Sequence, residues 1–376
     1  MVIVFAGLFA LTLFWLQQKL YQRWWKNDVR VLLNFEKTMV RAGGEVKLLE
    51  VVENRKRLPL PSLKVKFQCS RYLVFSDSTN SSVTDRYYRN DLFSVMPYQR
   101  VTRTHHIFCP KRGYYGIYGI DLVGVDLFFT EEMTCSMGSE TILYVLPEPF
   151  PQTLLATALK RIQGELEVRK YELEDPFTYQ GIREYQPFDT MKDINWKATA
   201  RTDELKVNIR AHTAVSSVRI FMNLEDNGIL RREELLEMTL SLCVGLAEQL
   251  LSQGIRLSIY GNGTDCVSGH MLELQDLTGR SSVETVYKAI ARIDLNAPME
   301  NFKAAFEEKL FDRRESIYTL FLSPDIHKDY QQVLQDYSKK AGEDFMWICS
   351  AKKEKETVTE IMEELRQYTL ILEEPE

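Results

Sequence analysis

The segment Tyr179–Arg210, YQGIREYQPFDTMKDINWKATARTDELKVNIR, lies between two parts of the chain that have different periodicities. Before it, apolar residues mostly recur at every second position, which is typical of strands in an antiparallel sheet. After it, short apolar runs alternate with amphipathic stretches of ten or more residues, which is typical of alternating strands and helices. We therefore expect the class of fold to change at this segment.

Within the segment, Thr190 followed three residues later by Asp193 predicts the start of a helix by a pattern like the capping box. In that helix Asp193 and Lys197 would lie one turn apart, at the spacing that supports an ion pair. The helix should end near Arg201, and the alternation over Leu205–Arg210 predicts a strand directly after it.

The segment also carries three guanidinium groups, which suit two-point contacts with carboxylates or phosphates: Arg183, Arg201 and Arg210. In one interpretation they pair with the acids of the segment itself, Asp189, Asp193 and Glu184, and fix a connector onto the core. In the other they bind an acidic group of a partner or a nucleotide phosphate. The residue mix favours the first, because structural ion pairs use the same side chains as functional sites.

The N-terminal stretch Val2–Leu16, VIVFAGLFALTLFWL, is uncharged and apolar, and Gln17–Leu20 extend it toward the ~20 residues that a transmembrane helix needs. Two tryptophans follow among cations, as at a membrane interface: Lys19, Arg23, Trp24, Trp25, Lys26 and Arg30. A signal peptide is less favoured because no small-residue cleavage site follows. A buried soluble helix is the alternative. By the positive-inside rule, we expect a single-pass protein of the cell membrane whose soluble part faces the cytoplasm.

The composition is that of an ordinary folded protein of 376 residues with a net charge of −6, long enough for two domains and a tether. No basic excess is present to neutralise phosphates, so we expect no nucleic-acid partner. The six cysteines are scattered without a Cys-x-x-Cys pair, which favours a reducing compartment over a disulfide framework or a zinc site.

The pattern predicts four regions: residues 1–28 as membrane anchor and interface belt, 29–150 as a β-sandwich of immunoglobulin-like size, 151–178 as a helical connector with an acidic linker, and 179–376 as the segment plus an α/β domain. Sandwich strands are expected at 31–36, 45–52, 63–69, 99–109, 116–122 and 141–146. The adjacent His105 and His106 would then face opposite sides of a strand and are expected to be structural.

In the last region, strands are expected at 218–222, 256–260, 270–274, 316–322 and 345–349, with helices at 231–253, 283–293, 298–310, 330–340 and 357–368. The connector helix is expected at 152–171, and Pro298 in the first turn of its helix. Alternation of this kind predicts a mostly parallel sheet covered on both faces, with its binding edge at the carboxyl ends of the strands.

Eight residues of the segment carry a family resemblance: Gly181, Arg183, Tyr185, Asp189, Ile194, Trp196, Ala200 and Arg201. Their spacing resembles the signature of a bacterial membrane-anchored family, domain of unknown function number fifty-eight, which has no established activity. The run Arg112-Gly113-Tyr114-Tyr115 is similar to a turn of that family. Val125–Phe129 lacks the Pro and Gly that the family commonly has at the next turn.

The resemblance implies that the C-terminal half is a Rossmann-like domain of von Willebrand factor A type. It also implies two partners, a MoxR-type AAA+ ATPase and a membrane protein with a transglutaminase-like domain. The family has two membrane spans ahead of its soluble part, whereas one is visible in this chain.

Von Willebrand A domains that bind metal do so through Asp-x-Ser-x-Ser after the first strand. Here the corresponding positions are Asn223, Glu225 and Asn227, and the next strand end offers Ser323 and Asp325. All five carry oxygen, so Mg²⁺ or Ca²⁺ is a candidate ligand at a degenerate site. Apart from such an ion, no cofactor is expected.

Other chemistries lack their motifs. Gly261-Asn262-Gly263 is interpreted as a turn. It lacks the third glycine that a dinucleotide fingerprint needs. The sequence has neither a P-loop nor a Gly-x-Ser-x-Gly elbow. Cys243 falls in a leucine-rich helical stripe and is expected in the core.

The sequence thus predicts an α+β multidomain chain with an N-terminal transmembrane helix, a β-sandwich and a Rossmann-like α/β domain. We expect it to act as a membrane-tethered, non-enzymatic adaptor for protein–protein interaction. Two alternatives stay open: an enzyme whose pocket uses Arg183, Asp189, Asp193 and Trp196, and a metal-dependent adhesion domain.

Overall fold

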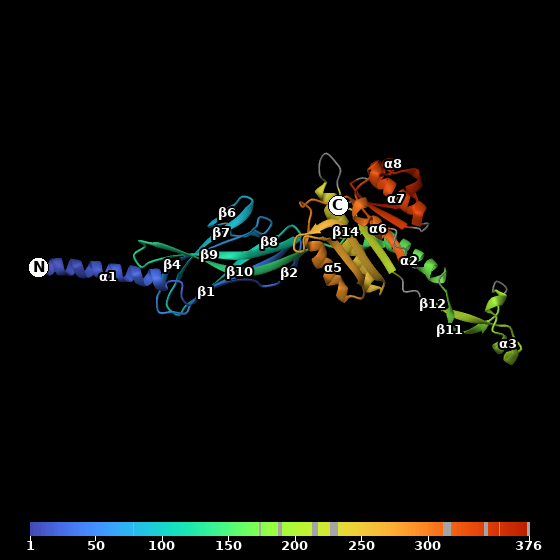
Figure 1. The fold of residues 1–376 in the computed structure, drawn as a ribbon, viewed down its shortest axis with the longest axis horizontal. Coiled ribbons are helices and arrows are strands. Elements are labelled where there is room, and N and C mark those ends of the chain that lie inside the picture. The colour runs from blue at the N-terminus through green and yellow to red at the C-terminus, as the bar shows by residue number, and fades with distance from the viewer. Residues whose placement is uncertain are drawn as a thin grey trace. The chain divides into compact units, whose positions relative to one another are not determined.

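The computed structural model describes residues 1–77, 79–172, 174–186, 190–212, 217–225, 232–310, 317–341, 345–352 and 354–373. The chain divides into two compact units, Met1–Glu148 and Pro149–Glu376. Figure 1 shows the elements of each unit.

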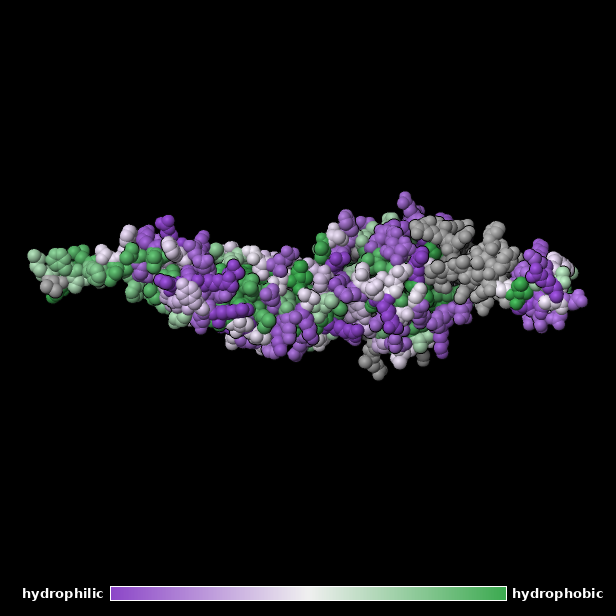
Figure 2. Space-filling model, turned by 90° about the horizontal axis from the view of Figure 1, so that it is seen from below, coloured by the Kyte–Doolittle hydropathy of each residue, from purple (hydrophilic) through white to green (hydrophobic). Residues whose placement is uncertain are grey.

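The first unit begins with the helix α1 (Val2–Trp24). Its segment Ile3–Trp24 is long and apolar enough to cross a membrane, and none of its apolar window is buried. In Figure 2 this end of the chain is predominantly hydrophobic at its surface. The last turn differs, because Tyr21 and Trp25 are buried in the core of the unit. The helix is therefore exposed over most of its length and rooted at its C-terminal end.

A β-sandwich makes up the rest of this unit. One sheet has the order β1-β3-β8-β5, from the strands Val29–Phe35, Gly44–Asn54, Arg100–Cys109 and Val74–Phe75. The other has the order β2-β10-β9-β4-β7-β6, from the strands Met39–Arg41, Glu132–Leu146, Gly113–Val125, Leu60–Ser70, Arg86–Val95 and Ser81–Val83. Neighbouring strands are antiparallel except β2 and β10, which are parallel. The expected sandwich and apolar N-terminal helix are confirmed.

Strand alternation builds the sandwich core, because every second side chain of a strand points to the same face. In β7 the buried positions are every second residue from Tyr87 to Val95. This strand was missing from the sequence prediction, because two of its inward positions are the charged residues Arg89 and Asp91.

The second unit contains a mostly parallel sheet with the order β15-β14-β13-β17-β18-β19. Its strands are Met271–Leu277, Arg256–Asp265, Ser217–Met222, Ile317–Leu322, Phe345–Ala351 and Thr369–Glu373, in that spatial order. β15 is antiparallel to β14, and the short β16 (Ile293–Asp294) pairs with the end of β14. The sequence predicted the parallel core strands and missed β19 at the edge.

Helices cover both faces of this sheet, as expected from the alternation. On one face lie α2 (Gln152–Glu172), α4 (Glu233–Ser252) and α5 (Ser281–Ala291). On the other, α6 (Phe302–Leu310) and α7 (Lys328–Ala341) pack against an aromatic core that includes Phe221 and Trp347. The helix α4 is also apolar enough to span a membrane, but 72% of its window is buried in the fold, so it is a core helix.

The segment between α2 and the sheet forms a small two-stranded module, residues 174–212, which we call the hairpin module. It consists of β11 (Glu174–Glu184), the 3₁₀ turn η1 (Met191–Asp193), α3 (Trp196–Thr202) and β12 (Lys206–His212). β11 and β12 are antiparallel. The run predicted as an acidic linker is therefore partly a strand, since Glu174 begins β11.

Three further predictions of local structure are wrong. Gly261-Asn262-Gly263 lies inside β14 and is not a turn. The helix expected from Pro298 begins at Phe302. The single helix expected over 357–368 is two short ones, α8 (Glu354–Glu360) and α9 (Glu363–Arg366).

Candidate functional site

The carboxyl edge of the parallel sheet brings together three of the residues predicted for a metal site. Asn223 follows β13 and Ser323 follows the adjacent β17, and the Asn223 Nδ2 donates to the Ser323 Oγ at 3.2 Å. The Asp325 backbone N–H donates to the same Oγ at 3.0 Å. All three side chains are buried. The rule that parallel strand ends meet at one edge therefore placed them correctly.

The side-chain oxygens at this edge are engaged within the fold. The Asn223 Oδ1 accepts from the backbone N–H of Glu225 at 3.0 Å and from the Asn262 Nδ2 at 3.1 Å. Because a carbonyl oxygen has two lone pairs, these two bonds fill it. The Asp325 Oδ1 accepts from the His327 backbone N–H at 2.9 Å and lies 2.5 Å from the His327 Nδ1. A cation would have to displace these bonds.

Glu225 contributes to the start of α6. Its Oε1 accepts from the Asn301 Nδ2 at 3.2 Å, and its Oε2 accepts from the Phe302 backbone N–H at 3.1 Å. A carboxylate at a helix N-terminus satisfies an N–H group that has no partner within the helix. Asn227 lies outside the described residues, so the five-residue metal site stays a prediction.

Asn262 was missed as a member of this edge. It is fully buried, accepts from the Leu224 backbone N–H at 2.8 Å and donates to the Glu300 carbonyl at 3.1 Å. The glycines beside it allow close packing, since a Cβ on Gly263 would lie 2.7 Å from Leu224 and Ile293. The Gly-Asn-Gly run thus indicates a tightly packed strand end, and the strand continues through it.

A buried tyrosine and tryptophan close the edge from the side of α7 and β18. The Trp347 Nε1 donates to the Ser323 carbonyl at 3.3 Å. Burial, the nearby Asp325 carboxylate and other acidic groups raise the pKa of the Tyr330 hydroxyl well above its usual value, so it is neutral at physiological pH. The edge is therefore a mostly neutral network of amides and hydroxyls with two acids among the described residues, Asp325 beside His327 and Glu225 at the start of α6.

The hairpin module contains the eight residues of the family resemblance. β11 contains Gly181 and Arg183, and Tyr185 directly follows its last residue. Ile194 forms an isolated bridge with Val207 of β12. The helix begins later than predicted, because its N-cap is Asn195, whose side chain accepts from the Ala198 N–H at 3.0 Å. The Thr190 hydroxyl instead bonds the Asp193 carboxylate. Asp189 lies outside the described residues.

Large apolar side chains of the module face solvent. The exposed fractions of Ile182, Met191, Trp196 and Leu205 are 53, 74, 64 and 43%. Ile194 and Val207 are buried and form its small interior. Trp196, Ala200 and Arg201 are exposed. The expected pairing of Arg201 with the acids of the segment stays a prediction.

The polar contacts of the module are largely local. The Arg183 Nη1 donates to the Glu184 carbonyl at 3.1 Å. The Lys206 ammonium lies 3.3 Å from the Glu184 carboxylate and 3.0 Å from the Glu204 carboxylate. Glu184 is therefore paired with a lysine. The side chain of Arg210 lies outside the description. With Trp196 open to solvent, this surface resembles a contact face more than a substrate pocket.

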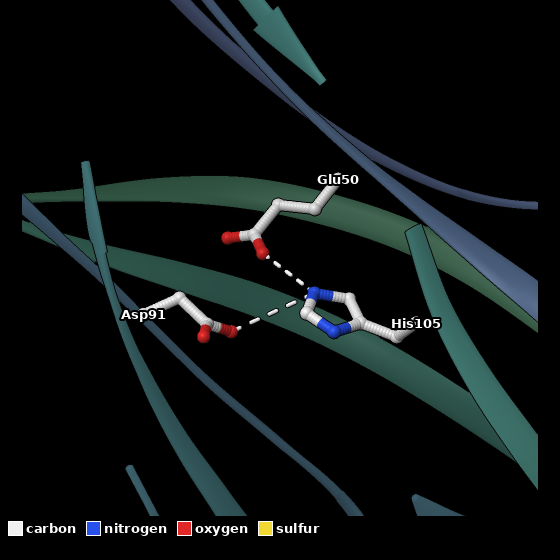
Figure 3. Close-up of side chains that lie close together, drawn as sticks. All are labelled: Glu50, Asp91 and His105. Carbon is white, nitrogen blue, oxygen red and sulfur yellow. Dashed lines mark hydrogen bonds and ion pairs between the residues drawn. The ribbon is translucent and has the colours of Figure 1, made fainter. Parts of the chain in front are cut away.

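A second polar cluster, which sequence reasoning missed, lies inside the sandwich (Figure 3). The His105 Nε2 lies 2.8 Å from the Glu50 Oε2 and 3.6 Å from the Asp91 Oδ2. The Arg89 Nε donates to the Asp91 Oδ2 at 2.6 Å, and the Arg103 Nη1 donates to its Oδ1 at 2.8 Å. Glu50, Asp91 and His105 are at most 4% exposed.

The ligand atoms of Glu50, Asp91 and His105 lie within 4.8 Å of one another, close enough to hold a divalent ion. Two features oppose this use. Both Asp91 oxygens already accept from guanidinium groups, and the two arginines balance the two carboxylates. A dication would leave excess positive charge in a buried site, which is costly. The cluster is better described as an ion network that joins the two sheets.

Burial raises the pKa of Glu50, and the Asp91 charge adds to that effect, while the hydrogen bond from His105 and the Arg103 charge oppose it. The Glu50 Oε1 is buried without a hydrogen-bond partner among the described residues. His105 and His106 lie on opposite faces of β8, as expected, and His106 is exposed. The signal that could have found the network is the presence of charged residues at inward positions of alternating strands.

The outer face of the larger sandwich sheet also carries a groove of about 610 Å³, lined by residues that include Lys66, Asn90, Asp121 and Ser136. The Ser136 Oγ donates to the Asp121 Oδ1 at 2.6 Å. Its lining is of mixed polarity, since Phe67, Ile120 and Met137 also contribute to it.

No family model matches the chain, and no curated protein matches it. Solved structures similar to part of it include a non-cellulosomal cohesin from Archaeoglobus fulgidus, at 8% identity and a TM-score of 0.23, covering 31% of this chain and 91% of that one. A cohesin–dockerin complex from Clostridium thermocellum is 12% identical with a TM-score of 0.23, and the match covers 32% of this chain and 100% of that one. The CARDB domain of a Pyrococcus furiosus protein is 15% identical with a TM-score of 0.20, and the match covers 31% of this chain and 94% of that one. Likenesses this weak carry no argument about function.

Proposed function

We propose that this protein is a membrane-tethered, non-enzymatic adaptor that binds a protein partner through the hairpin module. The observation that carries the proposal is the exposure of four large apolar side chains on a module of about forty residues: Ile182, Met191, Trp196 and Leu205. Exposed aromatic and methionine side chains are enriched at protein interfaces, where a few of them supply most of the binding free energy.

The α/β domain behind the module is, in this proposal, of von Willebrand factor A type and serves as a scaffold. The network at its strand edge supports a scaffold role, because Asn223, Asn262 and Glu225 use their polar atoms to hold β13, β14 and α6 together. Such side chains stabilise the fold and are not free to bind a substrate.

The helix α1 tethers the protein to the cell membrane. Its apolar surface is exposed, and the cations Arg23, Lys26 and Arg30 follow it, which favours a cytoplasmic soluble part by the positive-inside rule. By the family resemblance, the partner is a MoxR-type AAA+ ATPase, in company with a transglutaminase-like membrane protein.

The test is co-purification of the ATPase with the full-length protein from native membranes, with identification by mass spectrometry. Trp196→Ala should reduce the recovered ATPase strongly, since truncation of a central interface Trp costs at least about 2 kcal/mol, or roughly 30-fold in affinity. Tyr118→Ala is the matched control, because Tyr118 is an aromatic residue of the sandwich with 61% exposure against 64% for Trp196.

The two variants separate the outcomes. Recovery by the wild type and Tyr118→Ala but not by Trp196→Ala supports the adaptor. Equal recovery by all three removes the module from the interface. If no protein co-purifies and a small molecule does, the adaptor proposal fails.

A further inference from the structure

The turn between β9 and β10 exposes three consecutive large apolar side chains. Leu127, Phe128 and Phe129 are 46, 60 and 65% exposed. Phe129 also has a φ of 56°, a backbone conformation that is uncommon for a bulky residue. Backbone strain that presents an aromatic ring to solvent points to a function of the turn.

Asp126 fixes the shape of this turn. It accepts from the Thr130 backbone N–H at 2.7 Å, from the Thr130 hydroxyl at 2.6 Å and from the Glu131 N–H at 3.2 Å. Burial alone would raise the pKa of Asp126, but these bonds and one from Gln17 lower it to about 2. The turn is thus held by an ionised carboxylate.

The same turn lies along α1 (Figure 1). The Gln17 Nε2 donates to the Asp126 Oδ2 at 2.9 Å, and the Gln22 Nε2 donates to both Glu131 oxygens at 2.8 and 2.7 Å. Nearer the N-terminus, the rings of Phe14 and Phe128 lie 5.6 Å apart. The tip of the turn therefore reaches the level of Phe14.

That level lies within the apolar part of the helix. Phe14 is two residues before Leu16, where the apolar stretch ends, and two residues span about 3 Å along a helix axis. Trp15, which is 60% exposed, has the Lys19 ammonium 5.8 Å from its ring. Trp and Lys are typical of the membrane–water boundary.

The junction of helix and sandwich keeps this relation fixed. Trp25 packs on Gly124 at the end of β9, where an added Cβ would lie 2.6 Å from the indole ring. The Tyr21 hydroxyl donates to the Pro59 carbonyl at 2.9 Å. Helix and turn are both anchored to the end of β9 and cannot slide past each other without breaking these contacts.

The loop beside the junction adds positive charge. The Arg55 N–H donates to the Asp28 carbonyl at 2.9 Å, which places the exposed Arg57 near the end of α1, while Arg55 pairs with Glu53 and Lys56 is buried. Cations near a membrane surface are attracted to anionic lipid headgroups.

We propose that the turn Leu127–Phe129 inserts into the boundary of the bilayer that α1 occupies, as a second and shallower membrane contact of the sandwich. The occupant of this apolar surface is lipid, because the surface is continuous with the exposed apolar face of α1 through the Phe14–Phe128 contact. The inference rests on the tether in the proposed function. Two contacts with the bilayer would fix the tilt of the sandwich, which a lone helix leaves free.

The test uses the full-length protein in vesicles of phosphatidylcholine and phosphatidylglycerol, with a spin label at one position at a time. Phe128→Cys and Phe129→Cys are made in a Cys135→Ser, Cys266→Ser background, since the other four cysteines are buried. Leu8→Cys in α1 reports the bilayer, and Val83→Cys, 58% exposed in β6, reports water. Collisions of each label with oxygen and with a water-soluble nickel chelate are measured.

The labels at 128 and 129 should collide preferentially with oxygen, as the label at 8 does, while the label at 83 should favour the nickel chelate. If the labels at 128 and 129 behave as at 83 while the label at 8 is in lipid, the inference is overturned and the tether stands. If the label at 8 also favours nickel, the tether itself fails, and the inference with it. Spin–spin broadening that shows two copies covering the turn likewise contradicts insertion.

Discussion

The two units of this protein bury polar side chains in different ways. The sandwich buries charges: Glu50 and Asp91 lie against Arg89, Arg103 and His105 between its two sheets. The strand edge of the α/β unit mainly buries neutral groups, in which amides and hydroxyls of Asn223, Asn262 and Ser323 satisfy one another.

Each unit is therefore vulnerable to a different kind of substitution. A buried charge whose partner is removed is more costly than a buried amide in the same position, because its desolvation is no longer compensated. A network built of neutral groups is also insensitive to pH. The surface of the hairpin module belongs to neither network, which is why we assign the interaction to it.

The largest effect is expected from Asp91→Ala, which leaves the buried Arg89 guanidinium without its main partner. Removal of one member of a buried ion pair costs about 3–5 kcal/mol. Hydrogen exchange of the full-length protein should show the loss as reduced protection of β3, β7 and β8. Glu45→Ala, an exposed acid on β3, is the control and should change stability by no more than about 0.5 kcal/mol. Equal effects of the two variants would contradict the ion network.

A smaller effect is expected from Asn223→Ala at the strand edge. The change leaves the Glu225 N–H and the Asn262 amide without their shared acceptor and should cost about 1–3 kcal/mol. Protection of β13, β14 and the start of α6 should fall together. Asn296→Ala, at an exposed position of the same unit, should leave it unchanged. A loss as large as that of Asp91→Ala would erase the contrast between the two networks.

The smallest effect is a dependence of the stability of the sandwich on pH that comes from Glu50. The pKa of Glu50 is raised in the folded state, so its contribution is fully present below the unfolded pKa of about 4.5 and is lost as the pH rises through the folded pKa. Glu50→Gln removes the carboxyl group whose deprotonation causes this loss of stability. Relative to the wild type, its stability should increase as the pH rises above about 4.5.

The measurement is urea unfolding of the sandwich at several pH values, with the unfolding monitored by hydrogen exchange of the β3 amides. A difference between Glu50→Gln and the wild type that stays constant with pH would mean that Glu50 is ionised in the folded state throughout this range.

The parts of the fold that could be predicted from sequence are those where apolar periodicity is uninterrupted. β3 and α4 follow their patterns closely, and the meeting of Asn223 with Ser323 follows from the rule for parallel strand ends. β7 was not predicted because Arg89 and Asp91 occupy its inward positions and obscure the alternation.

The sequence pattern failed at residues that can serve more than one structural purpose. Thr190 has the sequence of a helix cap, yet its hydroxyl bonds Asp193 and the helix starts from Asn195. Gly261 and Gly263 look like turn residues, yet they permit close packing inside β14. The start of α6 could not be located from Pro298, because it is set by the Glu225 carboxylate, which accepts from the Phe302 N–H.

The most direct test of the adaptor is to place a photo-crosslinking amino acid at position 196 of the full-length protein in its own cells. The matched position is 118, which is similarly exposed on the sandwich. We expect an adduct with the AAA+ ATPase at position 196 and none at 118. The absence of that adduct at 196, or equal adducts at both positions, would contradict it.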